Sequence, residues 1–193
     1  MNKLYAVLSL IVLFTICLFF LLFILFEKNP NKPPSVLINK EVPKFITKNL
    51  FNKNIYLSSD NLVRNVNITP DENINLTEQN IDQKFTLINF FASWCAPCKA
   101  EHHIFFKLKK KYPSLFLLGI AHKDDPNDAK KYLSEEGNPY TFVGIDNDGK
   151  IALEFGVFGL PETFIINYKG EIVYKHTGPL TEEIVNDEIK LLF

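Results

Sequence analysis

The sequence predicts an α/β domain with a mixed β-sheet, preceded by one membrane-spanning helix. Three observations support this class. The first 26 residues contain an uncharged apolar run of the length that crosses a membrane. Two apolar segments flank a lysine-rich amphipathic segment between residues 87 and 121, which is the pattern of a parallel strand–helix–strand unit. Two β-like segments joined by a glycine turn near the C-terminus indicate an antiparallel hairpin.

The uncharged run extends from Leu4 to Phe26 and would measure about 34 Å as a helix, enough to cross a bilayer core. Lys3 precedes the run, which favours a cytoplasmic N-terminus and export of the remaining chain, although Lys28 and Lys32 reduce the charge asymmetry. A cleaved signal peptide is the alternative, but the run is long and lacks the small residues of a cleavage site. We therefore expect an uncleaved, single-pass anchor over residues 1–26.

Residues 27–41 are expected to form a tether between this anchor and the folded domain. They combine prolines with asparagines and lysines, which is typical of a semi-extended linker. The folded domain is then expected over residues 42–193, an ordinary domain size. The net charge of −1 and the absence of a basic patch give no indication of a nucleic-acid partner.

The most informative stretch is the apolar run that leads to Cys95 and Cys98. Residues 87–91 predict a buried strand, and the residues after Cys98 predict a helix that ends near residues 111–113. This order places Cys95 at the helix N-terminus, where free backbone N–H groups and the helix dipole favour a thiolate. Cys95 is therefore the candidate nucleophile. Cys98 follows Pro97 one turn into the helix, where we expect it to be better shielded and to act as the resolving thiol.

Two other uses of a C-x-x-C motif fit the sequence less well. A structural zinc site needs four ligands, but His102 and His103 lie on the same helix as the cysteines and cannot easily complete a tetrahedron. The remaining cysteine, Cys17, lies in the apolar N-terminal run. A c-type haem attachment site requires histidine directly after the second cysteine, where Lys99 stands. The redox use of the pair is favoured.

Local patterns predict the remaining elements of the domain. Short β-like pieces are expected at residues 44–46 and 54–57, a second buried strand at 115–121, a helix at 129–136, a strand at 141–145, a turn at 146–149, hairpin strands at 163–167 and 171–175, and an amphipathic helix at 181–192. The two buried strands around the cysteine-bearing helix should pair in parallel through a right-handed crossover.

A C-x-x-C pair at the start of a strand–helix–strand unit, followed by a hairpin and a helix, resembles the thioredoxin fold, a central mixed sheet flanked by helices. Proteins of that fold carry a cis-proline opposite the cysteines at the start of the hairpin, and Pro161 has this place. The fold implies that Leu160 offers its backbone N–H and C=O to an extended substrate. The alternative for Pro161 is an ordinary edge-strand proline.

Three longer motifs resemble the cytochrome c biogenesis thiol:disulfide interchange proteins of the CcmG/DsbE type. They are WCAPCKAEH at residues 94–102, GNPY at 137–140 and GVFGLPETF at 156–164. The third motif is more specific than the C-x-x-C pair, which the whole superfamily shares. With the anchor, the resemblance covers most of the chain, although residues 60–83 are longer and more polar than the family leads us to expect.

The resemblance implies a single-pass protein of the bacterial inner membrane whose domain works in the periplasm as a reductant. The cysteines of apocytochrome c tend to form disulfides in that oxidising compartment, whereas haem attaches only to free thiols. The implied substrates are apocytochrome c or haem-ligation maturation proteins, and the implied electron donor is a membrane thiol reductase. No metal or organic cofactor is expected, because the disulfide between Cys95 and Cys98 carries the redox equivalents.

The resemblance also places Glu101 and Glu162 in the active-site region. We expect negative charge there to oppose the helix dipole and to raise the pKa of the Cys95 thiol, the alternative being ordinary solvated carboxylates. Asn89 stands where many thioredoxins have a buried acid, and it cannot titrate. Glu101 or water would therefore accept the proton of the resolving cysteine. Trp94 is expected either to shield the pair and offer an apolar contact or to pack in the core.

Two other functions fit the same residues. One is a periplasmic thiol reductase of broader specificity, which would reduce unrelated disulfides as readily as those of a c-type haem motif. The other is a binding module that holds an extended apocytochrome segment along Leu160 without redox turnover. A protein lacking both Cys95 and Cys98 that still supported cytochrome maturation would favour the binding module.

Overall fold

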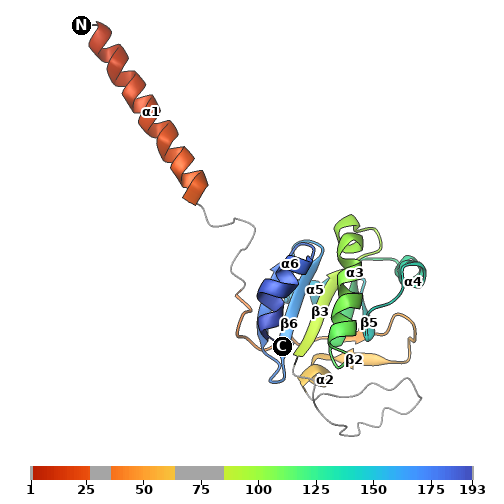
Figure 1. Ribbon diagram of the computed structural model, residues 1–193. Coiled ribbons are helices and arrows are strands. Elements are labelled where there is room, and N and C mark those ends of the chain that lie inside the picture. Colours follow the sequence, from red (N-terminus) through yellow and green to blue (C-terminus); the bar gives the residue numbers. More distant parts are fainter. Residues whose placement is uncertain (1, 27–35, 64–84, 193) are drawn as a thin grey trace. The chain divides into compact units, whose positions relative to one another are not determined.

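The computed structural model describes residues 2–26, 36–63 and 85–192 (Figure 1). The expected tether residues 27–35 and most of the polar stretch 60–83 lie outside the described residues. The chain divides into two units, Met1–Pro33 and Pro34–Phe193.

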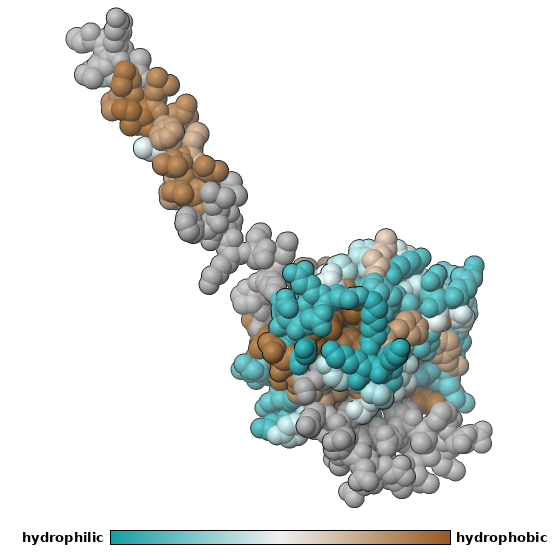
Figure 2. Space-filling model, viewed as in Figure 1, coloured by the Kyte–Doolittle hydropathy of each residue, from teal (hydrophilic) through white to brown (hydrophobic). Residues whose placement is uncertain are grey.

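The first unit contains one helix, α1, over Asn2–Phe26. The described side chains of α1 are mostly apolar and exposed, among them Phe14 and Phe19, and they give the helix its brown surface in Figure 2. Within the described residues, no helix meets the combination of length and apolarity that a membrane crossing requires.

The second unit is built on a five-stranded sheet with the strand order β5-β4-β3-β6-β7. Strands β3, β4 and β5 are parallel, whereas β6 and β7 run antiparallel to their neighbours, so the expected mixed sheet is confirmed. The carboxyl ends of the three parallel strands meet at one edge of the sheet. The strands are β3 (Phe85–Phe91), β4 (Phe116–His122), β5 (Phe142–Asp146), β6 (Glu162–Asn167) and β7 (Ile172–Thr177).

Three of the helices follow the parallel strands in turn. They are α3 (Ala96–Lys111), α4 (Pro126–Glu135) and α5 (Lys150–Glu154). Helix α5 was not predicted, because five residues are too few to show a helical period. It begins after the expected turn, and the buried carboxylate of Asp146 accepts the backbone N–H groups of Ile151 and Ala152 at its start.

The two ends of the domain differ in detail from the prediction. Strands β1 (Ile46–Lys48) and β2 (Tyr56–Ser58) pair antiparallel, with β1 starting two residues later than expected, and α2 covers Ser59–Val63. The helix expected over residues 181–192 consists of three consecutive segments. They are α6 (Glu182–Ile184), a π-helix (Val185–Ile189) and a 3₁₀-helix (Lys190–Leu192).

Strand β3 lies between two apolar layers, one on each face of the sheet. Its residues alternate between the faces of the sheet, so that Leu87 and Phe91 belong to the cluster that includes side chains of α3, α4 and the C-terminal helical segments. Ile88 and Phe90 belong to the opposite cluster, with side chains of α5 and of the residues before β3. Burial on both faces fixes β3, and with it the position from which the cysteine loop leaves the sheet.

Candidate active site

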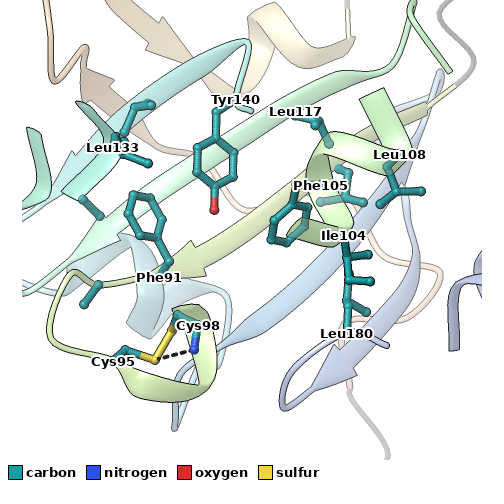
Figure 3. Close-up of a cluster of buried hydrophobic side chains, with 14 of the residues drawn as sticks. Phe91, Cys95, Cys98, Ile104, Phe105, Leu108, Leu117, Leu133, Tyr140 and Leu180 are labelled. Atoms are coloured by element: carbon teal, nitrogen blue, oxygen red, sulfur yellow. Dashed lines mark hydrogen bonds between the residues drawn. A yellow bond between two sulfur atoms is a disulfide. The ribbon is translucent and has the colours of Figure 1, made fainter. Parts of the chain in front are cut away.

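The two cysteines lie at the start of α3 and are joined by a disulfide (Figure 3). Their sulfur atoms are 1.97 Å apart and their Cα atoms 5.3 Å apart. Cys95 caps the N-terminus of α3, and its Sγ atom accepts a hydrogen bond of 3.2 Å from the backbone N–H of Cys98. In the reduced protein, this N–H and the helix dipole favour a thiolate on Cys95.

Burial does not distinguish the two cysteines. Cys95 is 4 % exposed and Cys98 is 3 % exposed, so the better shielding expected for Cys98 is not seen in the exposed fraction of either residue. What separates them is position, because only Cys95 stands at the cap, where its sulfur receives a backbone N–H.

The peptide bond between Leu160 and Pro161 is cis. In the register of β3 and β6, Phe90 lies opposite Glu162, which brings Pro161 to the end of β3 from which the cysteine loop starts. Leu160 packs against the cluster that contains both cysteines. Among the described residues, no backbone partner is found for the N–H or C=O of Leu160, so both groups are available to an added strand.

Trp94 is an exposed residue rather than a core residue. Its side chain is 63 % exposed, and its Nε1–H donates a hydrogen bond of 3.3 Å to the carbonyl of Lys123. Packing in the core is therefore excluded for Trp94. The exposed ring of Trp94, which directly precedes Cys95 in the chain, presents an apolar surface near the disulfide.

Glu101 is buried in a polar network on α3. It is 1 % exposed, its Oε1 accepts a hydrogen bond of 2.9 Å from Asn89 Nδ2, and its Oε2 accepts one of 2.7 Å from the backbone N–H of Leu180. Asn89 also accepts a hydrogen bond of 2.8 Å from the Tyr140 hydroxyl. Burial raises the pKa of Glu101 to about 8, because the hydrogen bonds only partly offset the loss of water around the charged form.

Glu162 is equally buried but has a cationic partner. Its Oε2 lies 2.8 Å from Lys175 Nζ, and its Oε1 accepts a hydrogen bond from the backbone N–H of Phe158. Lys175 also donates to the carbonyl of Gly156 and lies over the rings of Phe158 and Phe164. Glu162 and Lys175 therefore hold the loop that carries Pro161.

Neither carboxylate is the solvated group of the alternative interpretation. The charge of Glu162 is offset by Lys175, and Glu101 is largely neutral at neutral pH because its pKa is raised. Their combined effect on the pKa of the Cys95 thiol is therefore expected to be smaller than that of two free carboxylates.

Sequence reasoning missed several residues that organise the same edge of the sheet. Asp124 accepts hydrogen bonds from the backbone N–H (2.6 Å) and the hydroxyl (2.8 Å) of Ser93, which ties the cysteine loop to the end of β4. His122 Nδ1 lies 2.9 Å from Asp146 Oδ2, which joins the ends of β4 and β5. The signal that could have found them is their place directly at the carboxyl ends of parallel strands, where sites gather in α/β sheets.

The two histidines considered as zinc ligands contact backbone carbonyls. His102 Nε2 lies 2.9 Å from the carbonyl oxygen of Gly137, and His103 Nδ1 lies 3.0 Å from that of Ala100. Among the residues that the structure describes, no group of three or more His, Cys, Asp or Glu side chains is arranged to hold a metal ion. The chemistry that the described arrangement supports is thiol–disulfide exchange at Cys95 and Cys98.

Comparisons with known proteins agree with this geometry. Residues 41–190 match the Redoxin family. The thiol:disulfide interchange protein DsbE of Escherichia coli K12 is 34 % identical over 86 % of this chain and 78 % of its own length. The thiol:disulfide interchange protein HelX of Rhodobacter capsulatus is 34 % identical over 84 % of this chain and 81 % of its own length. The thioredoxin domain of a thiol-disulfide oxidoreductase from Bacteroides vulgatus, 16 % identical, shares the fold with a TM-score of 0.62 over 82 % of this chain and all of that domain.

Proposed function

The chain belongs to the Redoxin family and is a thiol:disulfide interchange protein of the DsbE type, and we propose that it reduces disulfides of apocytochrome c during cytochrome c maturation. The observation that carries this proposal is the Cys95–Cys98 disulfide at the cap of α3, beside the cis-proline loop, in which the Leu160 backbone has no backbone partner among the described residues. That arrangement suits a dithiol that acts on an extended polypeptide.

The reaction begins with the Cys95 thiolate. It attacks one sulfur of the substrate disulfide, so that the substrate S–S bond breaks, a mixed disulfide forms and one substrate thiolate leaves. Cys98 then attacks the Cys95 sulfur, which releases the second substrate thiolate and forms the Cys95–Cys98 disulfide seen in the structure. Two electrons pass from the protein to the substrate, and a membrane dithiol reductase must return them. No metal or organic cofactor takes part.

Glu101 is proposed to accept the proton that Cys98 loses before its attack. Glu101 follows Cys98 by three residues on α3, so the two are neighbours on one face of the helix, and both are buried. A carboxyl with a pKa of about 8 is well matched to a thiol, whose ordinary pKa is about 8.5. Glu162 is proposed as a positioning residue that holds the Pro161 loop through Lys175.

The chain is further proposed to be anchored in the bacterial inner membrane by residues 1–26, with residues 27–41 as a tether and the domain of residues 42–193 in the periplasm. The support for the anchor is the uncharged apolar sequence from Leu4 to Phe26 and the exposure of the apolar side chains described in α1. Partners would be membrane lipid, apocytochrome c or haem-ligation maturation proteins, and the membrane reductase. No nucleic-acid partner is proposed.

Trapping of the mixed disulfide in cells tests this function. A Cys98→Ser variant retains the nucleophile but cannot resolve, so the protein attached to Cys95 can be purified and identified. We expect apocytochrome c or a haem-ligation protein, released by reductant and absent from a Cys95→Ser, Cys98→Ser control. A broad mixture of unrelated exported proteins would instead indicate a reductase of broad specificity.

A further inference from the structure

A pocket of about 300 Å³ lies beside the redox pair and has no role in the reaction described above. Trp94 and Leu160, which directly precede Cys95 and Pro161 in the chain, form part of its wall. Leu153 and Phe158 add apolar surface, and both are exposed. The polar part of the wall is His122 and Lys123, so the pocket combines apolar surface with two groups that can carry positive charge.

Asp146 at the end of β5 orients both of these groups. Its buried carboxylate lies 2.9 Å from His122 Nδ1, and its backbone carbonyl accepts the N–H of Lys123 at 3.0 Å. A carboxylate only accepts hydrogen bonds, so His122 carries a proton on Nδ1. The Nδ1 edge of the imidazole is therefore committed to Asp146, which leaves Nε2 as the ring nitrogen available to a ligand in the pocket.

Lys123 is held in an unusual backbone conformation. Its φ angle is +46°, in the left-handed region that residues with a side chain seldom adopt. The Lys123 side chain crosses Gly149, where an added Cβ would lie only 2.5 Å from Lys123 Cε. Within the described residues, no carboxylate forms an ion pair with Lys123.

The acidic groups near the pocket are already engaged. The carboxylate of Asp146 is bonded to His122 and to the two backbone N–H groups at the start of α5, and Asp148 pairs with Lys150. Asp124 is bonded to Ser93. The ammonium group of Lys123 is therefore the charge that the pocket offers to a ligand, supplemented by His122 when it is protonated.

We propose that this pocket binds a carboxylate side chain of the substrate polypeptide, an aspartate or glutamate close in sequence to the reacting cysteine. The inference rests on the proposed function, because a substrate strand paired with Leu160 passes along the pocket wall. Lys123 supplies the opposite charge, and Trp94 and Phe158 cover the apolar part of the substrate side chain. His122 adds a hydrogen bond from Nε2–H only as an imidazolium, with a proton on each ring nitrogen.

Two disulfide-containing peptides that differ only by glutamate or glutamine beside the cysteine test this inference. The second-order rate constant for their reduction is measured with the reduced full chain. We expect the glutamate peptide to react about threefold to tenfold faster, with the ratio falling at high salt, as for a partly exposed ion pair. The ratio should approach one in Lys123→Gln and fall in His122→Gln. Lys131→Gln, an exposed lysine on α4, is the matched control and should keep the wild-type ratio.

Binding of the same peptides with serine in place of cysteine separates this inference from the proposed function. Tighter binding of the glutamate peptide to the oxidised full chain, lost in Lys123→Gln, supports the pocket even if neither disulfide peptide is reduced. Equal rates and equal binding of the glutamate and glutamine peptides overturn the inference, and they leave the reductase function intact if both peptides are reduced.

Discussion

Glu101 and Glu162 are both almost completely buried beside the cysteine pair, yet their surroundings differ. Glu162 faces the ammonium group of Lys175, whereas the partners of Glu101 are an asparagine amide and a backbone N–H. Without a cation, burial raises the pKa of Glu101 to about 8. Two buried carboxylates in one site therefore serve different purposes: Glu162 holds a loop through Lys175, and Glu101 can exchange a proton near neutral pH.

The largest effect is expected from removing the cation of the charged pair. Lys175→Met leaves Glu162 buried without its partner, which should lower the free energy of unfolding by about 4 kcal/mol at neutral pH. Urea unfolding followed by circular dichroism measures this. The double variant Lys175→Met, Glu162→Gln removes both charges and should recover most of the loss. A loss below about 1 kcal/mol in Lys175→Met would show that the pair does not hold the loop.

The next effect concerns the pH dependence of stability. The pKa of Glu101 is raised from 4.5 to about 8, so the unfolded chain binds fewer protons than the folded one between these values, and stability should fall as pH rises through that window. From pH 5 to pH 8 this contribution amounts to about 3 kcal/mol.

Glu101→Gln isolates that contribution, because glutamine does not titrate. The unfolding free energies of wild type and variant are compared at each pH. The altered hydrogen bonds of the variant add a constant difference, which does not affect the slope of the free energy against pH. Parallel pH profiles would contradict the assigned proton affinity of Glu101.

A smaller effect, about tenfold in rate, is expected for the resolution step. Release of reduced substrate by Cys98 should accelerate in wild type as pH rises toward about 8 and should be slower in Glu101→Gln at neutral pH. Rapid-quench trapping of the mixed disulfide measures the step. Glu162→Gln is the comparison variant, and an equal slowing in both variants would assign the effect to structure rather than to proton transfer.

The smallest effect is expected on the Cys95 thiol itself. Because Lys175 offsets the charge of Glu162, Glu162→Gln should lower the pKa of Cys95 by only a fraction of a unit, roughly 0.5 or less. The ultraviolet absorbance of the Cys95 thiolate, followed over pH in Cys98→Ser and in Cys98→Ser combined with Glu162→Gln, gives the difference between the two pKa values. No decrease at all would remove any electrostatic role of Glu162 at the nucleophile.

The central part of the fold was predictable because its signals are local. The apolar run of β3, the helix after Cys95 and the glycine turn of the hairpin each leave a clear pattern, and the observed strands differ from the expected ones by one or two residues. Helix α5 and the division of the C-terminal helix into three segments were not predicted, since short segments and local π or 3₁₀ geometry depend on tertiary contacts such as the capping by Asp146.

The sequence predicted the principal residues of the candidate site, but not which side chains contact one another there. The positions of Cys95, Cys98 and Pro161 follow from motifs, but the partners of the two glutamates do not. Lys175 comes from β7 and Leu180 from the residues after it, and nothing in their sequence spacing indicates which glutamate each one contacts. The exposure of Trp94 was not predictable either, because its indole N–H donates to the backbone carbonyl of Lys123, a contact between residues far apart in the sequence.

The central claim is that Cys95 attacks and Cys98 resolves. The most direct measurement reacts purified, reduced Cys98→Ser and Cys95→Ser variants with one disulfide peptide and follows the covalent adduct by mass spectrometry over time. We predict rapid formation of a stable adduct on Cys95 in Cys98→Ser and much slower reaction of Cys98 in Cys95→Ser. Equal rates for the two variants, or faster reaction at Cys98, would contradict the assignment.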